Sequence, residues 1–140
     1  MSFDEIVHSV CERMSGTIKV ANPGSDYQIE AQLEDGRHQR VFIVSDGETI
    51  RFSTQCSGWT TDFQQPNLFK TLLRKNFHLK HGYFALNDEG GVVLVDSQLL
   101  ETCDPEELYV TLVNLAEVGD FMERQLSGSI DEDDKTPDIY

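Results

Sequence analysis

Two histidines three positions apart, His78 and His81, have the residue type and spacing that could hold a metal ion. On a helix this spacing places both imidazole rings on one face. Gly82 follows at once, and no Cys, Asp or Glu stands at a supporting spacing nearby. We therefore predict no metal site. We expect the two histidines to form a basic patch with the neighbouring cations Lys70, Arg74, Lys75 and Lys80.

The stretch Cys56-Ser57-Gly58 contains the residue types of a nucleophile loop. A thiol or hydroxyl nucleophile needs an adjacent base and an orienting acid, and the elbow of serine hydrolases requires Gly-x-Ser-x-Gly. The sequence identifies neither of these, so we predict no catalytic residue and no enzyme. A small enzyme that uses Cys56 or the histidine pair is the less favoured alternative.

Acidic groups stand beside glycines at Asp88-Glu89-Gly90-Gly91. This stretch lacks the twelve-residue ligand pattern of a calcium loop, and no phosphate-loop lysine follows it. Glycine tolerates positive φ, so the stretch predicts a hairpin turn. We expect no cofactor.

The net charge of −14 over 140 residues limits the possible partners. An acidic surface repels phosphate, which disfavours nucleic acid and anionic membranes and favours basic or amphipathic polypeptides. The three cysteines are odd in number and far apart, as is typical of reduced thiols. With no apolar run of about 18 residues and no apolar signal region, the sequence predicts a cytoplasmic protein.

Hydrophobic periodicity divides the first half of the chain into one helix and three strands. Residues Ser2 to Met14 have apolar side chains on one helical face, with a capping box of Ser2 and Glu5. Residues 15–25 are expected to form a loop that contains a brief extended piece at Thr17 to Val20. Alternation predicts an antiparallel meander of three strands. Their ranges are Tyr27 to Glu34, Gln39 to Ser45 and Thr49 to Cys56, and a loop of residues 57–65 should follow.

Hydrophobic periodicity in the second half of the chain predicts a helix, two strands and a long helix. Apolar residues three and four apart follow Asn67, and short apolar runs at His81 to Asn87 and Val92 to Val95 flank the hairpin turn. Asp104 and Pro105 begin a helix that runs to Leu126. The order α-β-β-β-α-β-β-α predicts an α+β fold, with helices packed on an antiparallel sheet. One domain should span residues 1–126, followed by a flexible acidic tail at 127–140.

Several predicted strands are apolar on both faces, as in Val41-Phe42-Ile43-Val44. A sheet with helices on one side normally presents a polar second face to water. Either these strands are covered on both sides in a monomer, or their second face contacts another chain.

The sequence from about Phe3 to Leu126 also resembles a known family, and the motifs that carry the resemblance lie in its second half. The motifs are Leu72-Leu73-x-x-Asn76, Gly82-Tyr83-Phe84-Ala85-Leu86, Gly91-Val92-Val93-Leu94, Leu99-Leu100 and the helix from Pro105 to Leu126. In this order, and with this size and acidity, they are similar to the class I type III secretion chaperones of the Tir chaperone-like fold. The YbjN-like regulatory proteins share the same plan and form an alternative that acts through protein contacts.

The resemblance implies a homodimer that holds an extended segment of a client protein, such as a secreted effector, without hydrolysing it. It implies a dimer interface at Phe69, Leu72, Leu73 and Phe77. It implies peptide binding at Phe3, Val7, Val10, Ile29, Phe42, Val44 and Phe52. The basic patch departs from the family pattern, because it lies on the expected dimer helix, where two copies would repel each other unless they are splayed apart or paired with carboxylates.

Overall fold

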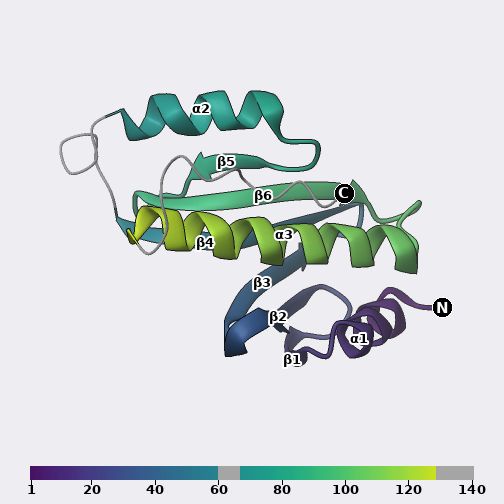
Figure 1. Ribbon diagram of the computed structural model, residues 1–140. Helices are drawn as coiled ribbons and strands as arrows, with labels where there is room; N and C mark the ends of the chain where they lie inside the picture. The colour runs from purple at the N-terminus through teal and green to yellow at the C-terminus, as the bar shows by residue number, and fades with distance from the viewer. Residues whose placement is uncertain (60–66, 129–140) are drawn as a thin grey trace.

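The computed structural model describes residues 1–59 and 67–128, and here three α-helices pack on one antiparallel sheet (Figure 1). The helices are α1 (Phe3–Arg13), α2 (Leu68–His78) and α3 (Pro105–Leu126), with a short 3-10 turn, η1 (Glu34–Gly36). The strands are β1 (Thr17–Asn22), β2 (Asp26–Gln32), β3 (His38–Ser45), β4 (Thr49–Trp59), β5 (Tyr83–Leu86) and β6 (Gly91–Leu99). The predicted α+β class is confirmed.

The strands lie in the order β1-β2-β3-β4-β6-β5, so the sheet has one strand more than predicted. The added strand is β1, which falls in the segment expected to be a loop, and it pairs with β2 from Thr17↔Glu30 to Asn22↔Asp26. Nearly all of its side chains are exposed. An edge strand without a buried face has no need of alternating polarity, and for this reason the sequence indicated only a brief extended piece at Thr17 to Val20 within a loop.

Strand β4 also runs further than expected. The predicted strand stopped at Cys56, whereas β4 continues to Trp59, which pairs with Gly91 of β6 across an irregularity in the register. The rest of the predicted loop lies outside the described residues, as does all but the first two residues of the predicted acidic tail.

Side-chain caps begin α1 and α3 as the sequence predicts. The hydroxyl of Ser2 accepts a hydrogen bond from the backbone N–H of Glu5 at 3.2 Å, and the Glu5 carboxylate accepts from the N–H of Ser2. The carboxylate of Asp104 accepts from the N–H of Glu107 at 2.8 Å at the start of α3. Each cap satisfies an N–H group that has no partner within the helix.

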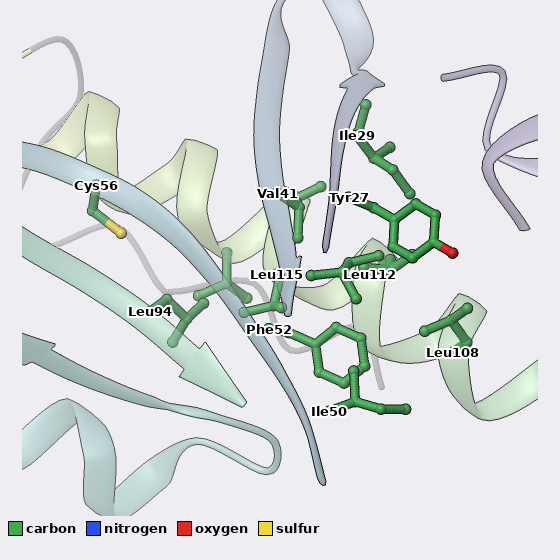
Figure 2. Close-up of a cluster of buried hydrophobic side chains, with 14 of the residues drawn as sticks. Tyr27, Ile29, Val41, Ile50, Phe52, Cys56, Leu94, Leu108, Leu112 and Leu115 are labelled. Carbon is green, nitrogen blue, oxygen red and sulfur yellow. The ribbon is translucent and has the colours of Figure 1, made fainter. Parts of the chain in front are cut away.

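Helices α1 and α3 cover one face of the sheet, and the hydrophobic core lies between them and the strands (Figure 1, Figure 2). Cross-strand partners share a face, so the register Ile29↔Val41↔Thr54↔Leu94 defines a row of core positions. Leu108, Leu112 and Leu115 of α3 pack on this face, fully buried. Within residues 1–59 and 67–128, no helix has the length and apolarity that crossing a membrane requires.

A glycine brings α3 close to the middle of the sheet. A Cβ atom at Gly119 would stand 2.6 Å from the Cγ2 of Thr54, nearer than real Cβ contacts come. The hydroxyl of Thr54 donates to the carbonyl of Arg40 and accepts from the Gln39 amide, both at 2.7 Å. The buried polar groups at this crossing are therefore satisfied, and α3 is held at a fixed height over β3 and β4.

Candidate functional site

The sheet face opposite α1 and α3 is called here the open face. Among the residues whose side chains the structure describes, it presents four large apolar side chains to solvent. They are 37% exposed at Phe42, 51% at Val44, 46% at Tyr83 and 62% at Leu99. Two rows of cross-strand partners build this face: Gln28, Phe42, Ser53, Val95 and Tyr83 in one, and Asp26, Val44, Arg51 and Ser97 in the next. Val95 is almost fully covered. The open face thus combines apolar side chains with small polar ones over several strands.

The charged groups of the open face are of both signs. Arg51 stands opposite Val44, and Arg40 lies 3.6 Å from Glu30 on the neighbouring strand. Both members of this ion pair are well exposed, so it contributes little to stability. The face can contact an apolar segment with polar or charged flanks.

The residues expected to bind peptide fall into two groups. Four of them lie in the hydrophobic core beneath α1 and α3, namely Val7, Val10, Ile29 and Phe52. Phe3 is half-buried, and its ring meets that of Tyr27 edge-on at 5.9 Å. Only Phe42 and Val44 of the seven lie on the open face with access to another chain. The apolar face of α1, with Val7 and Val10, and the covered face of the sheet, with Ile29 and Phe52, are therefore both used by this protein's own core.

The two edges of the sheet differ. On β5, the side chain of Asn76 accepts a hydrogen bond from the N–H of Phe84 at 2.6 Å and donates to its carbonyl at 3.1 Å. The amide thereby occupies backbone groups that point away from the sheet. On the other edge, β1 pairs with β2 alone among the described strands. An edge of this kind can accept an added strand.

The residues expected at the dimer contact lie on several sides of α2. Leu73 is 69% exposed and Phe77 is 85% exposed, whereas Phe69 is half-buried and Leu72 is buried in the core. The hydrogen bonds of Asn76 fix which side of α2 faces the sheet. Two large apolar side chains therefore project from the outer face of the helix.

The thiol of Cys56 is poorly suited to nucleophilic chemistry. It is 1% exposed, and burial, with a smaller effect of the Glu123 carboxylate, raises its pKa to about 12. A reactive cysteine needs a lowered pKa and access to solvent. A hollow of about 360 Å³ lies beside it, lined by Gln55, Cys56, Ser57, Gly58, Glu123, Leu126 and Ser127. In the described residues, no three His, Cys, Asp or Glu side chains are grouped to hold a metal.

A buried carboxylate, Asp120, which binds two arginines between α3 and the β2–β3 connection, was not anticipated from the sequence. Asp120 accepts from Nε of Arg37 and from Nε of Arg124, each at 3.1 Å, with its side chain 8% exposed. Burial, together with Asp120, raises the pKa of nearby Glu117 and Glu123. The spacing of Asp120 and Arg124 fits a helical ion pair, which is a signal available in the sequence. The long-range partner Arg37 gives no such signal.

Comparison with known proteins identifies a family and a similar solved structure. The model of the Tir chaperone protein (CesT) family matches residues 27–118. Among solved structures, the chain is similar to the Yersinia pestis type III secretion chaperone SycH, solved in complex with a stable fragment of YscM2. The TM-score is 0.53 at 14% identity, over 80% of this chain and 92% of that one. No curated protein matches the chain.

The family match spans more than half of the chain, from β2 into α3, and the resemblance predicted from the sequence is confirmed. The chain belongs to the Tir chaperone protein (CesT) family.

Proposed function

We propose that this protein is a non-enzymatic chaperone of the cytoplasm that holds an extended segment of a client protein as a homodimer. The open face carries this proposal, because Phe42, Val44, Tyr83 and Leu99 are exposed on a sheet whose other face packs against the hydrophobic core. Family membership supports the chaperone role, and the similar protein SycH is a chaperone whose structure contains a bound protein fragment.

The client segment lies across the open face and places apolar side chains against Phe42, Val44 and Leu99. It is free to continue as an added strand on β1, whose outer edge no described strand occupies. Backbone hydrogen bonds would then give affinity independent of client sequence, and the apolar contacts would select the segment. The client is held without any bond being broken, because nothing in this mode of binding requires a nucleophile.

The dimer contact uses the outer face of α2, through Leu73 and Phe77 with the edge of Phe69. Leu72 supports the helix from within the core. Burying exposed apolar side chains stabilises association by about 25 cal/mol per Å² of apolar area. The cations on and beside α2 oppose this contact between identical faces, so the association should tighten as salt screens them. Light scattering at tens of micromolar tests the dimer, and a strict monomer across that range would contradict it.

Client binding is tested with overlapping peptides from the proteins encoded beside this chain. The wild-type protein should bind a small set of these peptides, and the double variant Phe42→Ser/Val44→Ser should lose them. The matched control is Gln28→Ser/Ser53→Thr, which alters polar positions of the same face. Equal binding by the Phe42→Ser/Val44→Ser variant would remove the open face as the site. A regulatory partner in place of a secreted client would favour the YbjN-like alternative.

A further inference from the structure

Positive charge is distributed very unevenly along this acidic chain. It has 11 Lys and Arg residues against 25 Asp and Glu residues. Four of those cations, Lys70, Arg74, Lys75 and Lys80, fall within α2 and the turn after it, and no acidic residue occurs between positions 63 and 87. The α2 region is thus a positively charged segment in a protein of net charge −14.

The outer face of α2 combines these cations with apolar side chains. Lys70, Leu73, Arg74, Phe77 and His78 are three or four residues apart, so they share one helical face, and all five are exposed. Within residues 1–59 and 67–128, neither Lys70 nor Arg74 takes part in a salt bridge. Cations beside exposed leucine and phenylalanine side chains match an acidic segment that also carries apolar residues.

We propose that residues 129–140 of this same chain dock on the outer face of α2. Their sequence, Ser-Ile-Asp-Glu-Asp-Asp-Lys-Thr-Pro-Asp-Ile-Tyr, contains five side-chain carboxylates and one lysine. Ile130 precedes the acidic run, and Ile139 and Tyr140 follow it. The segment therefore carries both the charge and the apolar groups that complement the α2 face.

The geometry of the chain allows this contact. Helix α3 ends at Leu126, which lines a hollow with residues near the end of β4, and α2 is the next helix after β4 in the sequence. Figure 1 places the end of α3 and the start of α2 at the same end of the sheet. Twelve extended residues reach roughly 40 Å, and the eleven residues of α2 span about 16 Å. The segment is long enough to run along the whole helix.

Docking of this segment would cover Leu73 and Phe77, the side chains proposed for the dimer contact. A segment attached by a short linker acts at an effective concentration of about 1 mM, so even weak affinity gives substantial occupancy. The segment would then compete with a second copy of the chain. This consequence rests on the proposed homodimer, whereas the docking itself does not.

Docking is tested in the full-length protein by NMR. The backbone amides of α2 are compared between the whole chain and a chain that ends at Gly128. We expect the amides around Leu73, Arg74 and Phe77 to differ at about 50 mM salt and to converge at about 0.5 M salt, where screening is strong. Amides of β1 should not change. Identical α2 spectra at low salt would overturn the proposal.

A fluorescent peptide of residues 129–140, added to the shortened chain, measures the contact separately. It should bind with a dissociation constant of about 1 mM or tighter, which the effective concentration of an attached segment requires. Lys70→Glu/Arg74→Glu should weaken this binding at least about tenfold. The control Lys19→Glu/Arg51→Glu makes the same change in net charge on exposed residues of the sheet and should have a much smaller effect. Equal weakening by both variants, or greater weakening by the control, would overturn docking on α2.

Light scattering distinguishes this inference from the dimer proposal. If the shortened chain dimerises more tightly than the whole chain, the segment competes as inferred. If neither chain dimerises while the peptide still binds α2, the homodimer fails and the docking stands. If the whole chain dimerises more tightly than the shortened chain, the competition is refuted.

Discussion

Phe42 and Phe52 are the same residue type on neighbouring strands, yet they belong to two different surfaces. Phe52 of β4 is fully buried against α3, whereas Phe42 of β3 stands 37% exposed on the open face. Phe42 lies opposite Ser53, and Phe52 lies opposite Ile43, so one step along the strand changes the face. The covered face stabilises the fold, and the open face is free for a partner. Hydrophobicity alone does not distinguish these roles.

The largest expected effect on this comparison comes from the covered face. Phe52→Ala removes a fully buried ring and leaves a cavity under α3, so it should lower the free energy of unfolding by about 3–5 kcal/mol. Phe42→Ala, with a ring already partly in water, should cost less than about 1 kcal/mol. Urea denaturation of both variants measures the difference. Equal losses would mean that the open face is as tightly packed as the core.

The sequence predicted the two faces of some strands better than those of others. Alternation in Tyr27 to Glu34 assigned β2 correctly, with Tyr27, Ile29 and Ala31 buried. In Val41 to Val44 every side chain is apolar, so no period shows which pair faces α3. The structure resolves this through register, since Val41 and Ile43 join the core row and Phe42 and Val44 do not. Register depends on pairing between strands and is not a local property of sequence.

The residues of the candidate site could be predicted only in part, because their burial also depends on contacts between distant parts of the chain. The family resemblance predicted both exposed and buried residues for the site. The exposed ones are Phe42, Val44, Leu73 and Phe77, and the ones buried in the core are Val7, Val10, Ile29 and Phe52. The spacing of apolar residues predicted the apolar face of α1. It did not predict that α3 packs near this face, because α3 lies about 90 residues further along the chain. The Arg37–Asp120 contact was missed for the same reason, since its two residues are 83 positions apart.

A smaller effect is expected at the β5 edge, which closes one side of the open face. Asn76→Ala removes both hydrogen bonds to the backbone of Phe84 and leaves those groups without protein partners. We expect a loss of about 2 kcal/mol, given about 0.5–1.5 kcal/mol for each bond. Amide exchange of Phe84 should also accelerate. In the control Asn76→Asp, an acceptor for the Phe84 N–H remains, so its exchange should be slower than in Asn76→Ala.

The covered face should also respond to alkaline pH through Cys56. Burial raises the folded pKa of this thiol from 9.0 to about 12. A raised folded pKa means that the stabilisation is complete below about pH 9 and is lost as the pH rises towards 12. Between about pH 8 and about pH 10 the contribution should fall by about 1.4 kcal/mol, one unit of pKa difference.

Denaturation of the wild type and Cys56→Ala at both pH values isolates this contribution. Tyr27, whose pKa burial also raises to about 12, is present in both proteins and cancels in the comparison. The wild type should lose more stability than Cys56→Ala over this interval. Parallel losses would show that the folded thiol ionises as easily as an exposed one, and the covered face would then admit water near β4.

The smallest effect on stability should come from the open face, where the proposal places the function. Phe42→Ser/Val44→Ser changes side chains that are 37% and 51% exposed, so the pair should alter the free energy of unfolding by less than about 1 kcal/mol. Client peptides should nevertheless be lost, because these side chains supply the apolar contact. Urea denaturation and peptide binding on the same protein preparation measure both quantities. Loss of binding with little loss of stability would mean that Phe42 and Val44 are kept exposed for a partner, whereas a loss near that of Phe52→Ala would assign them to the fold instead.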